Sequence, residues 1–268
     1  MAGLAIKSAA AVPTKYGVVT GANKGIGFEI CKQLASRGIS VLLTARNRER
    51  GLDAVERLGM DNITFHELDV LDSASVHALA AYLNSQIGKL DILVNNAGAN
   101  GITNSGPGKK TEYELAEECI QTNYYGTKRT IEGLLPLLHL SDSPRIVNVS
   151  STMGTFGSNR DLEKLTVTEE GIDELLAEFL HDLKEGSLRA RGWPTHWGAY
   201  CVSKAAVTQY TKLLAEKHPR MLINSVCPGW VNTDLSNHSG PSTPEEGASS
   251  PVNLALLPDG GPSGLFFH

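Results

Sequence analysis

The sequence has few cysteines, no long apolar run and no excess of positive charge. Its 268 residues include only four cysteines, which are scattered and lack metal-ligand spacing: Cys31, Cys119, Cys201 and Cys227. This usage is typical of reduced thiols in a cytoplasmic protein, and it argues against a disulfide scaffold or a metal site. No apolar run reaches the roughly 20 residues of a membrane-spanning helix. A formal net charge of -5 argues against nucleic acid as a partner.

Residues 1–15 form an alanine-rich stretch without the long apolar core of a signal peptide. We expect a loose leader there. No repeat and no low-complexity linker divides the rest of the chain. The sequence therefore predicts a single domain over 1–268.

Short apolar runs alternate with helical patterns along the chain. The runs predict strands at 16–20, 41–44, 63–68, 90–95, 145–149, 222–226 and 265–267. Helical patterns lie between most of them, for example at 26–37, 73–86, 111–138 and 200–217. Apolar strands separated by helices predict an α/β fold with a parallel sheet covered on both faces.

The segment 152–198 is much longer than a usual connection. Within it, apolar residues recur at helical spacing and predict an inserted helix over 168–186; they are Ile172, Leu175, Leu176, Phe179, Leu180 and Leu183. This apolar stripe must be buried, either against the same domain or against a partner subunit. The sequence leaves both alternatives open.

A glycine-rich turn, TGANKGIG at 20–27, follows the first predicted strand. Gly21 permits the turn, and Gly25 and Gly27 let the backbone approach a phosphate at the N-terminus of the next helix. A helix start with a few glycines is the alternative for this motif alone. A Walker-type loop is excluded, because no Gly-Lys-Ser/Thr follows Lys24.

Arg46 follows the second predicted strand, where an NAD site would place an acidic residue for the ribose. Arg46 and Lys24 together suit a 2′-phosphate, which an arginine can bind through two hydrogen bonds. The pattern therefore favours NADPH/NADP+ as the cofactor. A solvated surface arginine is the alternative.

The third and fourth predicted strands also end in residues suited to a dinucleotide. Asp69, followed by Val70, could hold an adenine amino group, and the small residues after Asn95 leave room for a ribose. Asp69 could equally be a helix N-cap.

Tyr200 and Lys204 stand at i and i+4 and therefore on one face of a helix. The pKa of a free phenol is about 10, and lowering it by three units corresponds to about 4 kcal/mol. Lys204 and a positive nicotinamide could supply this energy. Tyr200 would then protonate a developing alkoxide or deprotonate an alcohol. Ser150 and Ser151 offer a hydroxyl to the carbonyl oxygen, although either could merely cap a turn.

Several motifs stand together in the order typical of one family: DV at 69–70, NNAG at 95–98, TNYYGT at 122–127, NVSS at 148–151, YCVSK at 200–204 and CPGWVNTD at 227–234, all after the glycine turn. The chain thereby resembles the short-chain dehydrogenase/reductase superfamily. It is especially similar to the NADPH carbonyl reductases, including the plant menthone and salutaridine reductases. The resemblance implies a doubly wound Rossmann fold with a seven-stranded parallel sheet.

The resemblance also implies a catalytic tetrad. Asn123 would hold a water in the proton relay, and Ser151 would polarise the carbonyl. Tyr200 would be the acid/base, and Lys204 would hold the nicotinamide ribose and lower the tyrosine pKa. The implied cofactor-binding residues are Gly21, Asn23, Lys24, Gly25, Ile26, Gly27, Arg46, Asp69, Val70, Asn95, Ala97, Gly98, Tyr200, Lys204, Pro228, Gly229, Val231 and Thr233.

Met153, Trp193 and Trp230, with Ser151, would line a pocket for a hydrophobic ketone. In the similar enzymes the inserted helix covers a surface that others use to dimerise, which implies a monomer. We therefore expect a cytoplasmic NADPH-dependent reductase of a hydrophobic ketone or aldehyde. An NADP+- or NAD+-dependent alcohol dehydrogenase is one alternative. A catalytically idle NADP-binding protein is another, because the chain ends at His268, before the short tail usual in the family.

Overall fold

A seven-stranded parallel sheet forms the centre of the computed structural model, which describes residues 15–102, 108–155 and 168–268. The strands lie in the order β3-β2-β1-β4-β5-β6-β7. Their bounds are β1 Tyr16–Val19, β2 Ser40–Ala45, β3 Ile63–Glu67, β4 Ile92–Asn95, β5 Arg145–Val149, β6 Leu222–Val226 and β7 Phe266–Phe267. The predicted doubly wound α/β fold is confirmed. The leader expected over 1–15 lies outside the described residues except for Lys15.

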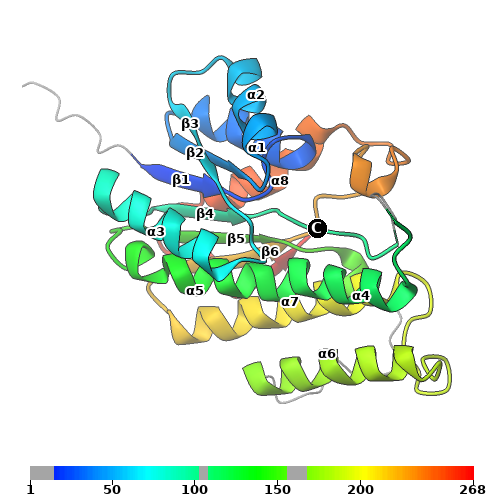
Figure 1. Ribbon diagram of the computed structural model, residues 1–268. Coiled ribbons are helices and arrows are strands. Elements are labelled where there is room, and N and C mark those ends of the chain that lie inside the picture. The colour runs from blue at the N-terminus through cyan, green and yellow to red at the C-terminus, as the bar shows by residue number, and fades with distance from the viewer. Residues whose placement is uncertain (1–14, 103–107, 156–167) are drawn as a thin grey trace, which may run out of the picture.

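Helices cover both faces of the sheet (Figure 1). One face carries α1 (Gly25–Ala35), α2 (Arg48–Leu58) and α8 (Pro244–Ala255), and the other carries α3 (Ser73–Gln86), α4 (Glu112–Ile120), α5 (Gly126–Leu138) and α7 (Gly198–Lys217). Each side has its own cluster of buried apolar side chains. No helix in the described ranges is long and apolar enough to cross a membrane.

The strand order reverses at β1, which pairs with β2 on one side and with β4 on the other. Helices that follow β1 and β4 therefore leave on opposite faces, and a crevice opens at the carboxyl ends of these two strands. The chain bends there through backbone hydrogen bonds from Thr20 N to Val94 O (3.0 Å) and from Ala22 N to Thr44 O (2.8 Å). This crevice positions the glycine-rich turn beside the ends of β2 and β4.

The helix predicted over 111–138 is wrong in one respect, because a π-helical turn interrupts it. The turn η1 (Gln121–Tyr125) separates α4 from α5. Such turns occur mostly as single insertions in α-helices, often at functional sites. Apolar spacing does not reveal the turn, since buried residues continue on both sides of it. The other named strands and helices begin and end within two residues of the predicted bounds.

The inserted helix α6 (Glu169–Lys184) packs against α4 and α7 of its own chain, outside the layer they form (Figure 1). Ile172, Leu176 and Phe179 are its buried apolar residues. At its first turn, Glu169 pairs with Lys128 (3.0 Å) and with Lys217. The apolar stripe is therefore buried against the same domain.

Replacing Phe179 by alanine is expected to lower the free energy of unfolding by about 3–5 kcal/mol, because it leaves a cavity between α6 and the body of the protein. Glu174→Ala, on the exposed side of α6, should change it by less than about 0.5 kcal/mol. Urea unfolding of both variants at two protein concentrations provides the measurement. A Phe179→Ala cost near that of the control, or one that depends on protein concentration, contradicts docking within one chain.

Candidate active site

The glycine-rich turn leaves no room for side chains at two of its positions. Gly21 has a left-handed backbone (φ 62°), and a Cβ there would lie 2.8 Å from Ala97 Cα. A Cβ on Gly27 would lie 2.5 Å from Asn96 Nδ2 and 2.8 Å from Gly21 O. Contacts under about 3 Å force the surroundings to shift, so this path of the chain requires glycine.

Asn96 and Thr20 hold the turn in place. Asn96 Nδ2 donates to Thr20 O (3.0 Å) and Gly21 O (3.1 Å), while Thr20 Oγ1 accepts from the backbone N–H groups of Asn96 and Ala97. Asn95 donates from Nδ2 to Asn148 Oδ1 inside the sheet (2.9 Å), and its contact with the cofactor stays a prediction. Asn96 is thus the amide that supports the turn.

The turn fits the pyrophosphate of a dinucleotide. Helix α1 begins in this turn, and the side chain of its N-cap residue Lys24 does not bond to the first backbone N–H groups of the helix. Unpaired N–H groups at a helix N-terminus stabilise an anion. Asn23 and Ile26 belong to the same turn and are half-buried.

The two cations predicted to bind the 2′-phosphate, Arg46 and Lys24, differ in their surroundings. Arg46 is exposed just beyond the end of β2. Lys24 forms an ion pair with Asp234, in the loop after β6. The sequence alone gave no indication of this partner, which is 210 residues away.

Asp69 Oδ1 accepts from Leu71 N (2.9 Å) and shapes the turn after β3. The helix N-cap alternative for Asp69 is wrong, because Asp72 caps α3 by accepting from Ala74 N. Val70 is buried, and its side chain faces Gly126 of α5. These contacts hold the chain at the carboxyl edge and leave the adenine role of Asp69 a prediction.

The loop after β6 carries the remaining predicted cofactor residues. Pro228 and Gly229 begin it, and Gly229 has a left-handed backbone (φ 86°). Val231 is buried, and the Thr233 methyl group would lie 3.3 Å from a Cβ placed on Gly25. The loop therefore lies directly over the glycine-rich turn.

Ser151, Tyr200 and Lys204 come together beyond the end of β5. Tyr200 and Lys204 are buried on one face of α7, with Lys204 Nζ 5.6 Å from the centre of the Tyr200 ring. The Ser151 hydroxyl lies close enough to the Tyr200 phenol to lower its pKa. Lys204 Nζ also donates to Val149 O (2.7 Å), the last residue of β5. A hydroxyl, a phenol and an ammonium group thus converge at one place.

Burial sets the protonation of this group. It raises the pKa of Tyr200 above its ordinary value, and the hydrogen bond from Ser151 offsets only part of that change. The expected lowering of this pKa by Lys204 is therefore not seen in the protein alone. Burial also lowers the pKa of Lys204 to about 8. At neutral pH the phenol is protonated and most of the ammonium is charged.

The two serines after β5 have different roles. Ser150 is buried, donates to Lys204 O (2.9 Å) and hydrogen-bonds to Thr208 (2.9 Å), so it attaches α7 to the sheet. Ser151 accepts from Met153 N (3.1 Å), which caps the short helix η2 (Thr152–Gly154). The serine that reaches the phenol is the second one, as the resemblance implies.

The amide of Asn123, in the π-helical turn, connects three segments. Its Nδ2 donates to Ala99 O and to Ser203 Oγ (both 2.9 Å), and its Oδ1 accepts from Ala99 N (2.8 Å). Ser203 Oγ in turn donates to Tyr200 O (2.9 Å). A Cβ on Gly98 would lie 3.3 Å from Asn123 Oδ1 and 3.8 Å from Lys204 Nζ. The NNAG segment at 95–98 therefore lies beside both Asn123 and Lys204.

Ser203 is a site residue that sequence reasoning missed. Its available signal was its position three residues after Tyr200, on the same helical face. The role of Asn123 in holding a water remains a prediction.

The three predicted pocket residues differ in their exposure and contacts. Trp230 is 62% exposed in the loop after β6, and Met153 is half-buried next to Ser151. Trp193 is buried, where its Nε1 donates to Asp182 Oδ2 (2.7 Å) and its ring packs edge-on against Phe179. Trp193 therefore packs against α6 through Asp182 and Phe179 and does not face an open pocket.

A different tryptophan contacts the candidate catalytic group. The Trp197 ring packs edge-on against Tyr200, with ring centres 5.7 Å apart. Trp197 also has a left-handed backbone (φ 57°), which is uncommon for a bulky residue. Such strain often marks functional sites.

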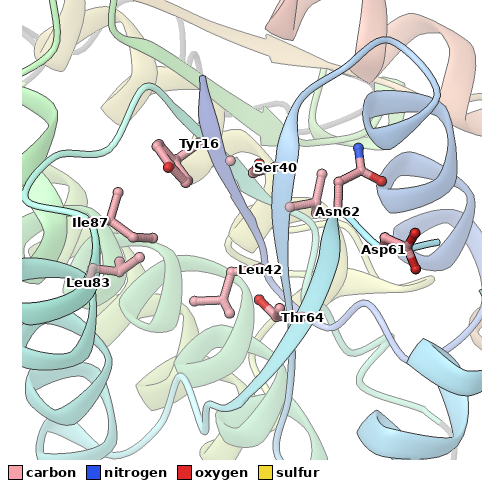
Figure 2. A pocket seen from close by; sticks show the side chains of 10 residues that line it. Tyr16, Ser40, Leu42, Asp61, Asn62, Thr64, Leu83 and Ile87 are labelled. Atoms are coloured by element: carbon pink, nitrogen blue, oxygen red, sulfur yellow. The ribbon is translucent and has the colours of Figure 1, made fainter. Parts of the chain in front are cut away.

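A cavity of about 180 Å³ lies at the opposite edge of the sheet, near the amino ends of β1 and β2 (Figure 2). Its lining includes Tyr16, Leu42 and Asn62. The Asn62 amide donates to Ala35 O and Ile39 O. This cavity is separate from the carboxyl edge and is not part of the candidate site.

Replacing Ser203 by alanine is expected to lower the free energy of unfolding by about 1–3 kcal/mol, because a buried amide and a buried carbonyl each lose a partner. Ser249→Ala, which removes an exposed hydroxyl from α8, should change it by less than about 0.5 kcal/mol. Both values come from urea unfolding. Equal costs for the two variants would show that the Ser203 bonds do not hold the site together.

Comparison with known proteins agrees with this geometry. The family model described as short chain dehydrogenase matches residues 15–161 and 186–243. A (+)-neomenthol dehydrogenase of Arabidopsis thaliana is 51% identical over 94% of this chain and 95% of its own. The NADPH carbonyl reductase 1 of Sus scrofa is 39% identical over 94% and 91%.

Among solved structures, salutaridine reductase from Papaver somniferum is 44% identical and superposes with a TM-score of 0.89, covering 94% of this chain and 99% of its own. The family model and the relatives span both the glycine-rich turn and the Tyr200 helix. The chain therefore belongs to the short-chain dehydrogenase family.

Proposed function

We propose that this protein is an NADPH-dependent reductase that transfers hydride to the carbonyl group of a hydrophobic ketone or aldehyde. One observation carries the proposal: the Tyr200 phenol lies close to the Ser151 hydroxyl, with the Lys204 ammonium 5.6 Å from the centre of the same ring. This group lies at the edge of the sheet that also carries the glycine-rich turn.

A reduced nicotinamide, when bound, supplies the hydride. Tyr200 donates the proton that the carbonyl oxygen needs as its negative charge develops. Ser151 donates a hydrogen bond to the same oxygen and stabilises that charge. The two hydroxyls lie close to each other, so a carbonyl oxygen that enters between them would meet two donors at once.

Burial raises the pKa of Tyr200, so the phenol carries the proton that reduction consumes. The same group would accept the proton when an alcohol is oxidised, so an NADP+- or NAD+-dependent alcohol dehydrogenase stays the alternative.

NADPH is proposed on the basis of Arg46 and Lys24, together with the similarity to the pig NADPH carbonyl reductase. The remaining predicted cofactor residues, including Asn95 at the end of β4, belong to the proposal at the positions described above. Lys204 would hold the nicotinamide ribose.

A hydrophobic substrate is proposed from the exposed indole of Trp230 and from relatives named for neomenthol and salutaridine. Met153 and Trp197 would add apolar surface beside Ser151 and Tyr200. The covering of α4 and α7 by α6 supports a monomer.

The reaction is tested by following the loss of NADPH absorbance with a panel of hydrophobic ketones. Tyr200→Phe is expected to lower kcat/KM by about 10²–10⁴-fold, the usual contribution of a general acid, while NADPH binding followed by fluorescence is retained. Tyr82→Phe, at a partly exposed tyrosine on α3, is the matched control. Tight NADPH binding by the wild type without turnover of any carbonyl or alcohol contradicts the proposal and favours an idle binding protein.

The pH dependence tests the role of Lys204. Its ammonium is charged below its pKa of about 8 and loses the charge above it. The kcat/KM for NADPH, at saturating carbonyl substrate, is therefore expected to be level near neutral pH and to fall about tenfold per pH unit above pH 8. A profile that stays flat or rises through this range would exclude the charged lysine as a cofactor-binding group.

A further inference from the structure

The ion pair between Lys24 and Asp234 joins the glycine-rich turn to the loop after β6. Both side chains are more than half exposed, at 56% and 55%. Exposed ion pairs of this kind contribute little to stability. The contact therefore offsets the charge of Lys24 but holds its side chain only weakly.

Asp234 is held near the turn by contacts that do not involve Lys24. It begins the short helix η3 (Asp234–Ser236), whose next residue accepts a hydrogen bond from Asn100 Nδ2 through Leu235 O (2.9 Å). On the other side, Asn232 N donates to Ser242 O (2.8 Å) and closes the base of the loop. A carboxylate is thus fixed beside the lysine by the backbone.

A second group also engages this carboxylate. His238 Nε2 lies 3.0 Å from Asp234 Oδ1, and its Nδ1 lies 3.0 Å from Asn232 Oδ1. The pKa of Asp234 is lowered, with the hydrogen bond from Lys24 as the largest cause. Asp234 therefore remains charged at neutral pH.

This arrangement has a consequence for cofactor choice, which rests on the proposed function. Lys24 is one of two cations assigned there to the 2′-phosphate that distinguishes NADPH from NADH. A phosphate that approaches Lys24 competes with Asp234 for the ammonium and also meets the negative charge of this carboxylate. NADH has no such phosphate and does not compete for the lysine.

We propose that Asp234 is a specificity-determining residue that limits the preference for NADPH over NADH by competing with the 2′-phosphate for Lys24. The opposite role is that Asp234 orients Lys24 toward the phosphate. The two roles differ in sign, because removing the carboxylate tightens NADPH binding in the first case and weakens it in the second.

The test is a fluorescence titration of NADPH and NADH in phosphate-free buffer at one low ionic strength. Asp234→Asn is expected to lower the Kd for NADPH about two- to five-fold, the change that corresponds to losing one exposed ion pair. The Kd for NADH should stay unchanged, which also reports that the variant is folded. Asp53→Asn removes the same charge from an exposed pair with Arg57 on α2 and should not alter the NADPH/NADH ratio.

A double-mutant cycle with Lys24→Met tests whether Asp234 changes NADPH binding through Lys24. Lys24→Met should weaken NADPH binding, and adding Asp234→Asn in that background should have no further effect on the Kd for NADPH. An unchanged or raised Kd for NADPH in Asp234→Asn, or an equal effect without Lys24, overturns the proposal.

The same titration separates this inference from the proposed function. If the wild type binds neither NADPH nor NADH, the proposed function and the role of Asp234 are both overturned. If it binds NADPH and reduces a carbonyl while Asp234→Asn leaves the NADPH/NADH ratio unchanged, only the role of Asp234 is overturned.

Discussion

The side-chain amide of Asn123 is the contact on which the arrangement of the site depends. It pairs with both backbone groups of Ala99 and with the hydroxyl of Ser203, which in turn bonds to the carbonyl of Tyr200. Because buried polar groups must be paired, the loop after β4, the π-helical turn and α7 can adopt this arrangement only together. The network thereby fixes Tyr200 and Lys204 against the end of β5. Burial in the same place keeps the phenol protonated and lowers the pKa of Lys204.

Most of the fold is predictable because the apolar pattern and the turn residues agree. Apolar strands, intervening helices and the stripe of α6 all have a period that can be read from the sequence. Helix α2 is not among the predicted helices because charged residues dominate its sequence, although Ala54, Val55 and Leu58 on one side of it pack on the core. The π-helical turn was missed for a different reason, since tertiary hydrogen bonds from Asn123 stabilise it and leave no local signal. The burial of α6 against its own chain likewise required the three-dimensional structure.

The site is predictable where a motif fixes both the residue and its surroundings. Gly21, Gly27, Ser151, Tyr200 and Lys204 belong to this class, and the family resemblance that identified them is confirmed. Contacts between distant segments were not predictable: the partner of Lys24, the support of the turn by Asn96, and the exchange of Trp193 for Trp197 beside Tyr200. Each of these contacts depends on which loops lie next to one another at the carboxyl edge of the sheet. Residue type and spacing in the sequence do not predict which loops those are.

The most direct test of the central claim is a crystal structure of the protein with NADP+ bound. We expect the pyrophosphate to lie on the glycine-rich turn and Lys204 to contact the nicotinamide ribose. We also expect the nicotinamide to face the Ser151 and Tyr200 hydroxyls. A dinucleotide bound elsewhere, or one whose nicotinamide lies away from the Tyr200 phenol, would contradict the assignment of this edge as the place of hydride transfer.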